Sequence, residues 1–264
     1  MTLGLTQVAD IIKKGLSDSL QATSQKAAVD ALNDVVTRGA IQSNPYNWDA
    51  RNAAMDAVTD VINASKIFSQ DEILRIMGMK DFVKAKLTIS WMPEGLNGHT
   101  FNFTGRDRFV VAGGCFTSIL HNKDVNDYDL FLLGYDDDLM KESSFVKQLD
   151  DVEQIHRGRF ITIDHSDYKM NPNILKTYLD NQTRIQYIFT KYKTRKELVD
   201  HFDFVHCCIS YDLGEDKLYI TKETYDMNVT QKLKKNPTTD RINPRRITKF
   251  ENKGWTRYYE ANTL

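Results

Sequence analysis

Apolar residues recur every three or four positions along three stretches of the first 62 residues, which is the spacing of an amphipathic helix. The positions are Val8, Ile11, Ile12, Leu16 and Leu20, then Ala28, Ala31, Leu32 and Val35, then Ala54, Ala57, Val58, Val61 and Ile62. A further short helix is expected to begin at Ser69, which precedes the acidic Asp71 and Glu72, and to end near Met79. Residues 1–82 are therefore predicted to form an all-helical amino-terminal domain.

From Lys86 onwards the pattern becomes that of strands alternating with helices. Strands are predicted at Lys86–Trp91, Thr100–Thr104, Phe109–Ala112, Tyr128–Leu133, Phe160–Asp164, Arg184–Thr190, Asp203–Tyr211 and Lys217–Thr221. Helices are predicted at Cys115–His121, Ser144–Asp150 and Lys193–His201. This alternation predicts an α/β (α+β) domain with a mixed sheet over residues 83–264, ending in a basic helical segment.

A glycine turn stands between the apolar strand at 109–112 and the helix that follows it. Gly113 and Gly114 allow a ligand to approach the backbone, and the free N–H groups that open the helix suit an anion such as a triphosphate. Ser118, one turn into this helix, is placed to donate a further hydrogen bond. The turn is therefore a candidate phosphate-binding site.

Three aspartates are candidate magnesium ligands. Asp127 and Asp129 flank Tyr128, and on a strand the period of two puts both carboxylates on one face. Asp203 begins an apolar run that is expected to be buried, where an unpaired carboxylate is costly unless a cation balances it. The structural alternatives are Asx turns for the pair and a strand-end position at the rim of the sheet for Asp203.

These residues resemble the signature of the nucleotidyltransferase superfamily, which includes DNA polymerase β and the CCA-adding enzymes. The matching features are Gly113-Gly114, a spacer of twelve residues, and Asp127-Tyr128-Asp129 between apolar positions. From Phe109 to Tyr258 the chain also looks like small phage-encoded nucleotidyltransferase-like proteins. Thr117-Ser118 stands where the CCA-adding branch usually has Arg-Asp, which argues against maturation of tRNA 3′ ends.

The resemblance implies transfer of a nucleoside monophosphate from a nucleoside triphosphate to a hydroxyl group, with release of pyrophosphate. It implies two Mg²⁺ ions, one held by Asp127 and Asp129 and one shared with Asp203. Either Asp203 or a metal-bound hydroxide would take the proton of the attacking hydroxyl. The acceptor stays open among RNA, a protein side chain and a small molecule.

The charge distribution adds a basic segment to this picture. Residues 121–170 hold twelve acidic and six basic side chains, a balance of −6, whereas residues 231–256 hold eight basic and two acidic ones. Arg246, Lys249 and Lys253 share one helical face around Phe250, so they are candidate nucleotide-binding residues, and Arg245 and Trp255 stand beside them. The alternative is an ordinary solvated helix.

Composition sets the remaining expectations. The apolar runs are too short to cross a bilayer, and the three cysteines cannot form a disulfide framework, so a cytoplasmic setting without membrane contact is expected, that of the host if the chain is phage-encoded. Zinc binding by His206, Cys207 and Cys208 is not favoured, because neighbouring strand residues alternate faces. The rival to an enzyme is a catalytically silent phage protein of the same fold, whose helical domain docks onto a larger assembly.

Overall fold

The structure is a computed structural model that describes residues 67–90, 108–155, 158–163, 171–239 and 242–258. The three helices predicted before residue 66 and the strand predicted at Thr100–Thr104 lie outside the described residues. The chain divides after Leu74 into two units, and the account below concerns the second of them, together with the helix that begins just before this point. The boundary predicted at residue 82 stays a prediction.

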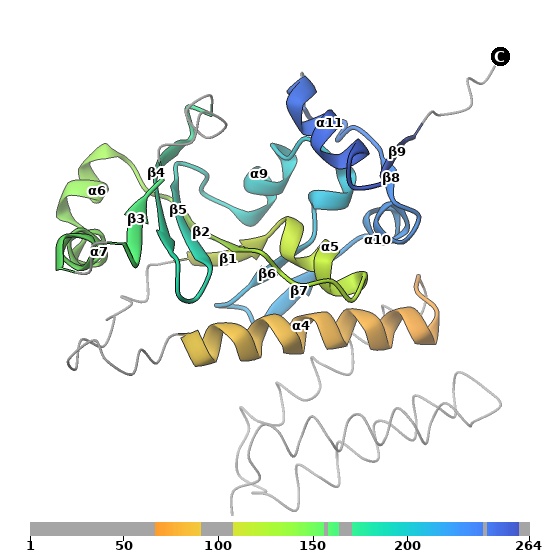
Figure 1. The fold of residues 1–264 in the computed structure, drawn as a ribbon, viewed down its shortest axis with the longest axis horizontal. Helices are drawn as coiled ribbons and strands as arrows, with labels where there is room; N and C mark the ends of the chain where they lie inside the picture. Colours follow the sequence, from red (N-terminus) through yellow and green to blue (C-terminus); the bar gives the residue numbers. More distant parts are fainter. Residues whose placement is uncertain (1–66, 91–107, 156–157, 164–170, 240–241, 259–264) are drawn as a thin grey trace, which may run out of the picture. The chain divides into compact units, whose positions relative to one another are not determined.

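A seven-stranded mixed sheet forms the centre of the described fold (Figure 1). Its strands are β1 (Arg108–Ala112), β2 (Tyr128–Leu133), β3 (Phe160–Thr162), β4 (Ile174–Asp180), β5 (Ile185–Thr190), β6 (Ser210–Asp212) and β7 (Lys217–Tyr219). They lie in the order β3-β4-β5-β2-β1-β6-β7. The β2–β5 pair is parallel, and the other pairs of this sheet are antiparallel. The predicted mixed-sheet α/β fold is confirmed.

Helices and a small second sheet complete the described chain. The helices are α4 (Gln70–Ser90), α5 (Gly114–Leu120), α6 (Asp137–Glu142), α7 (Ser144–Ile155), α9 (Arg195–Asp200), the 3₁₀ helix η1 (Val205–Cys207), α10 (Lys222–Val229) and α11 (Pro244–Glu251). Two short strands, β8 (Lys232–Leu233) and β9 (Thr256–Arg257), pair in parallel. This pair brings the chain after α11 back beside the chain after α10.

Two predicted strands are wrong. The strand at Lys86–Trp91 is helical as far as Ser90, because α4 continues well beyond Met79. Met79, Val83 and Leu87 recur every four residues and are buried in the main core, so packing favours the helix. The Ser69 N-cap is as predicted: Glu72 N–H donates to Ser69 Oγ, and Glu72 Oε2 accepts from Ser69 N–H at 2.8 Å.

The strand predicted at Asp203–Tyr211 is replaced by a bend at Asp203, the 3₁₀ helix η1 and the short strand β6. The apolar run from Phe204 has no alternation to define a strand, and Phe204 instead forms an isolated bridge with Lys235. The acidic run that begins at Asp136 starts a helix, with Asp136 as its N-cap. Asp136 Oδ1 accepts from the N–H groups of Asp138 and Leu139 in the first turn of α6.

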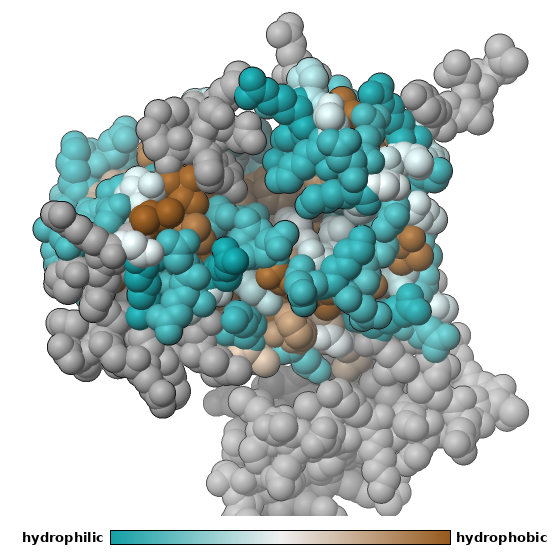
Figure 2. Space-filling view, viewed as in Figure 1, coloured by the Kyte–Doolittle hydropathy of each residue, from teal (hydrophilic) through white to brown (hydrophobic). Residues whose placement is uncertain are grey.

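The face seen in Figure 2 is mainly hydrophilic, and its hydrophobic residues form separate groups. Among the described residues, the exposed large hydrophobic side chains lie far apart in the sequence, namely Ile67, Phe82, Leu139, Ile161, Val229 and Tyr258. Among the residues described, no helix combines the length and the apolar character needed to cross a membrane.

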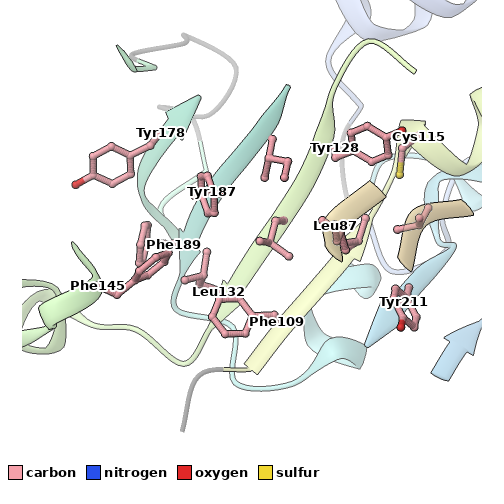
Figure 3. Packing of buried hydrophobic residues seen from close by; sticks show 14 of the residues in the cluster. Leu87, Phe109, Cys115, Tyr128, Leu132, Phe145, Tyr178, Tyr187, Phe189 and Tyr211 are labelled. Carbon is pink, nitrogen blue, oxygen red and sulfur yellow. The ribbon is translucent and has the colours of Figure 1, made fainter. Parts of the chain in front are cut away.

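The main core covers one face of the large sheet (Figure 3). Tyr128 and Leu130 of β2 point into it, together with Tyr187 and Phe189 of β5. The other face carries a smaller cluster that includes Phe131 and Ile188. Since side chains alternate along a strand, Asp129 and Gln186 lie on this second face, beyond the end of the smaller cluster.

Candidate active site

The acid pair stands at the start of β2, on the face opposite the main core. Tyr128 and Leu130 are buried in that core, whereas Asp127 and Asp129 line a cavity on the other side. The arrangement is the one expected from the period of two. Asp127 is exposed and Asp129 partly buried, so the pair reaches from the sheet towards solvent.

Gly113 connects β1 to α5 in a conformation that side chains disfavour, with φ 91° and ψ −141°. Its N–H donates to the carbonyl of Ile209 at 3.3 Å, which ties the turn to the chain before β6. A Cβ added to Gly113 would stand 3.5 Å from Asp129 Oδ2, so the turn passes beside the acid pair. At Gly114 an added Cβ would meet no atom within 4 Å, and this residue borders open space.

Asn228 of α10 links α5 to η1. Its Oδ1 accepts from Thr117 Oγ1 at 2.7 Å, and its Nδ2 donates to the carbonyl of His206 at 2.8 Å. The side chain is fully buried, where hydrogen bonds to polar partners are costly to lose. Ser118 on α5 and Asp203 before η1 are thereby held on one framework.

An aromatic cluster anchors the basic helix α11. Phe250 packs edge-on against Phe204 and Trp255, with ring centroids 5.4 and 5.6 Å apart. Asn243 caps the helix by accepting from the N–H of Arg245 at 3.0 Å. The basic residues Arg246 and Lys249 lie on this helix, whereas Lys253 lies just beyond the helix end at Glu251.

One cavity of about 1340 Å³ brings the predicted residues together. All nine candidates line it: Gly113, Gly114, Ser118, Asp127, Asp129, Asp203, Arg246, Lys249 and Lys253. Arg245 and Trp255 line it as well. The carboxylates of β2 and the cations of α11 thus border the same space, although they lie more than a hundred residues apart in the chain. Their roles there remain a proposal.

The electrostatic state of Asp129 follows from its position. Burial raises the pKa of Asp129 to about 7, the nearby Asp127 carboxylate adds to the rise, and Arg246 and Lys249 oppose it. The positive side chains of α11 are therefore near enough to act on the acid pair. They do not fully offset the cost of holding a second negative charge beside Asp127.

Asp203 has a different partner from the one expected. Its Oδ2 forms an ion pair with Arg246 Nε. Within the described part of the chain, no three His, Cys, Asp or Glu side chains lie close enough together to hold a metal ion. In this arrangement Asp203 neutralises Arg246 instead of joining Asp127 and Asp129, and a role as third ligand would require the ion pair to open.

His206 and Cys207 are buried and uncharged. Burial lowers the pKa of His206 to about 3 and raises that of Cys207 to about 11. Cys207 Sγ lies 3.4 Å from His206 Nε2, but neither member carries the charge that a thiolate–imidazolium nucleophile needs. The His206 ring instead stacks beside Trp255, with centroids 4.0 Å apart.

The donor set suits a hard cation such as Mg²⁺. Asp129 Oδ1 and Gln186 Oε1 are shielded from solvent and have no hydrogen-bond partner among the described residues, although both side chains line the cavity. Buried oxygens normally have a partner, and carboxylate and amide oxygens are ligands that such cations prefer. Sequence reasoning missed Gln186 as a site residue, although a polar residue within the apolar strand Ile185–Thr190 was a visible signal.

Comparisons with known proteins place the chain in a family. No curated protein matches it. A tRNA nucleotidyltransferase solved with a primer tRNA and an incoming ATP analogue aligns at 12% identity and a TM-score of 0.39, covering 58% of this chain and 44% of that one. A tRNA-processing enzyme solved with CTP aligns at 14% identity and 0.40, covering 58% and 40%. The chain therefore spans less than half of either structure.

The family described as Gad2, Gabija anti-defense 2 family protein, matches residues 83–231. This range contains the glycine turn, the acid pair, Gln186 and Asp203, and it ends before α11. Because the match covers more than half of the 264 residues, the chain belongs to the Gabija anti-defense 2 family.

Proposed function

We propose that this protein is a Mg²⁺-dependent nucleotidyltransferase that moves a nucleoside monophosphate from a nucleoside triphosphate to a hydroxyl acceptor. The observation that supports this most is the shared cavity, which the carboxylates of Asp127 and Asp129 and the cations of α11 both line. A nucleoside triphosphate combines a metal-binding phosphate chain with a high negative charge, and such a cavity matches both properties.

The residues have separate tasks in this proposal. Asp127 and Asp129 hold Mg²⁺, while Arg246, Lys249 and Lys253 bind the phosphates. Gly113, Gly114 and Ser118 form the part of the wall where a phosphate oxygen can approach the chain closely. The chemistry that bound Mg²⁺ supplies is charge neutralisation at the triphosphate and at the in-line transition state.

The reaction requires one proton to be removed. The acceptor oxygen forms a bond to the α-phosphorus, the bond from this phosphorus to the bridging oxygen breaks, and pyrophosphate leaves. Arg246 is paired with Asp203 before substrate arrives, and turning towards the triphosphate would free the Asp203 carboxylate. Asp203 Oδ2 is then the base that takes the proton of the acceptor hydroxyl.

The family suggests where to search for the acceptor. Its description, Gabija anti-defense, supports looking for the acceptor among components of Gabija-defended cells. RNA, a protein side chain and a small molecule all offer the hydroxyl that the chemistry needs. The cavity is large enough for a nucleotide together with part of an acceptor, since ligand sites commonly measure about 300–1,000 Å³.

A second candidate function is a non-catalytic interaction protein that keeps this fold. The observation in its favour is that Asp203 is paired with Arg246 and stands apart from the acid pair. A protein that binds a nucleoside triphosphate and Mg²⁺ but releases no pyrophosphate would represent this function. Turnover therefore separates the two candidates, whereas nucleotide binding does not.

The deciding experiment supplies each α-labelled nucleoside triphosphate with Mg²⁺ to lysates of cells with and without Gabija defence. RNA, protein and small-molecule fractions are then counted for label. Wild type is compared with Asp127→Asn, and Asp138→Asn is the matched control, because it makes the same chemical change on α6 at a residue that does not line the cavity.

Label transferred by wild type and Asp138→Asn, but not by Asp127→Asn, supports the enzyme and identifies its acceptor class. Label found only in the defended lysate would connect the acceptor to Gabija. If wild type binds a nucleoside triphosphate in calorimetry but labels no fraction, the non-catalytic function replaces this proposal.

A further inference from the structure

Gln186 lies beside the acid pair because β2 and β5 run parallel. The register pairs Asp129 with Gln186, and neighbouring residues in register point to the same face of a sheet. Asp127 and Asp129 reach that face from β2, and Gln186 reaches it from β5. The three side chains therefore converge at one end of the two strands, at the cavity.

A hydrogen bond fixes the orientation of the Gln186 amide. Its Nε2 donates to Asp127 Oδ2 at 2.7 Å. A carboxylate accepts hydrogen bonds and cannot donate one when ionised, so the amide nitrogen must face Asp127 and the oxygen must face away. The side chain is 8% exposed, and Oε1 has no hydrogen-bond partner among the described residues.

The unsatisfied oxygen has a companion. Asp129 Oδ1 is also shielded and lacks a partner among the residues described. Two such oxygens at paired register positions would each be destabilising if nothing bound them. Both oxygens donate electron pairs, so both can bind a divalent cation. A further carboxylate could not bind them, because its oxygens are electron-pair donors as well.

We propose that Gln186 Oε1 is a direct ligand of the divalent metal ion that Asp127 and Asp129 bind, in the place where Asp203 was expected. This inference rests on the proposed function, of which it specifies the metal site. Two carboxylates and one neutral amide oxygen balance the two positive charges of the ion. Asp203 stays available for Arg246, and the remaining positions of the ion are left for substrate oxygens and water.

Two substitutions of Gln186 distinguish binding of the metal by this residue from a role that is limited to positioning Asp127. Gln186→Glu removes the donor to Asp127 but keeps an oxygen at the same place, whereas Gln186→Met removes both and keeps a side chain of similar length. A ligand role predicts that Glu retains metal affinity and that Met weakens it about tenfold or more. A role limited to holding Asp127 predicts that both substitutions weaken it alike.

The measurement is the titration of the full chain with Mn²⁺ in the absence of nucleotide. Electron paramagnetic resonance reports the concentration of free Mn²⁺ at each point. Gln182→Met is the matched control, since Gln182 lies in the exposed turn before β5 and does not line the cavity. Circular dichroism checks that each variant folds. If Gln186→Met does not fold, Gln186→Asn, which keeps the amide but shortens its reach, takes its place with the same expected loss.

The outcomes are distinct. The inference is supported if wild type and Gln186→Glu bind Mn²⁺ most tightly, Gln186→Met binds it more weakly, and Asp127→Asn binds it most weakly. Equal losses in Glu and Met, or no loss in Met, overturn it but leave the proposed function intact as long as Asp127→Asn loses Mn²⁺. Absence of Mn²⁺ binding by wild type, with and without added nucleoside triphosphate, overturns both.

Discussion

Arg246 of α11 forms an ion pair with Asp203, which lies in the bend before η1. Both side chains are partly exposed, at 34% and 21%, so the pair contributes little to stability, on the order of 1 kcal/mol or less. Its interest is chemical. Arg246 is expected to bind phosphate, and Asp203 is expected to act on the acceptor. Without substrate, the two side chains are paired with each other.

Asp203→Asn tests this relationship. If Asp203 is the base and not a metal ligand, the substitution lowers kcat by about 10²–10⁴-fold while Mn²⁺ affinity stays near that of wild type. Titration with Mn²⁺ beside steady-state kinetics measures both quantities on one preparation. A loss of Mn²⁺ affinity as large as that of Asp127→Asn would return Asp203 to the metal site.

The stability of the protein should fall in mild acid because of His206. The folded pKa is about 3 and the ordinary value is 6.5, so below pH 6.5 the unfolded chain binds a proton that the folded chain excludes. This contribution is fully present above pH 6.5 and falls as the pH drops towards 3. Between pH 6.5 and pH 5 the loss is about 2 kcal/mol.

Urea unfolding at half-unit steps from pH 5 to pH 7 measures this slope. His206→Phe keeps an aromatic ring against Trp255 and removes the titrating group, so its unfolding free energy should depend less on pH over this range. His201→Phe is a suitable control, because His201 is exposed at the end of α9. The same slope in wild type and His206→Phe would show that other groups cause the acid sensitivity.

The two glycines of the turn should respond differently to alanine. Gly113→Ala forces a side chain into a backbone region that glycine alone adopts readily, at a cost of about 1–3 kcal/mol. Gly114→Ala meets no atom within 4 Å, so the fold tolerates it. The added methyl group of Gly114→Ala nevertheless occupies the cavity border, and weaker binding of nucleoside triphosphate is expected.

Thermal unfolding and calorimetric titration of the two variants separate these effects. Gly113→Ala should lower the Tm, whereas Gly114→Ala should keep the Tm and lose affinity. Unchanged nucleotide affinity in Gly114→Ala would mean that the phosphates do not pass close to this part of the turn.

The cations of α11 and of the turn that follows it should control affinity for anionic ligands. Lys249→Ala combined with Lys253→Ala removes two phosphate contacts, each worth about tenfold in binding if it supplies about 1.4 kcal/mol. For RNA the dependence of log K on log salt should become shallower by about 1.5. Lys141→Ala with Lys147→Ala, two exposed lysines outside the cavity, is the control pair. Equal behaviour of the two pairs would make α11 an ordinary solvated helix.

Local patterns predicted much of this architecture. The strand predicted at Tyr128–Leu133 agrees with β2 at both ends, because the apolar run Leu130–Leu133 ends at Gly134 and the acid pair marks its beginning. The residues from Lys86 to Ser90 alternate and include β-branched side chains, so they fit a strand until Leu87 is known to pack one turn after Val83. The sheet residues that bury Leu87 are distant in sequence, so the alternation within Lys86–Ser90 does not reveal that this segment continues the helix.

For the candidate site too, local features could be predicted from the sequence and contacts between distant segments could not. Glycine spacing and the acid pair were visible because their geometry is local to one strand and one turn. A polar residue at Gln186 was visible too, but its place beside the acid pair was not, because that depends on the parallel register between β2 and β5. The ion pair between Asp203 and Arg246 could not be predicted for a related reason: it depends on where α11 packs against Phe204, which no local pattern reveals.

The acid pair lies inside the range that the family match covers, whereas the cations around α11 lie outside it. Strands β2 and β5 lie within residues 83–231, which the family match covers, whereas α11 begins at Pro244. The helix is attached through a few aromatic rings and the short β8–β9 pair. If the proposed function holds, changes in the segment around α11 would alter which nucleotide or acceptor is recognised, while the strands that hold the acid pair and Gln186 would stay as they are.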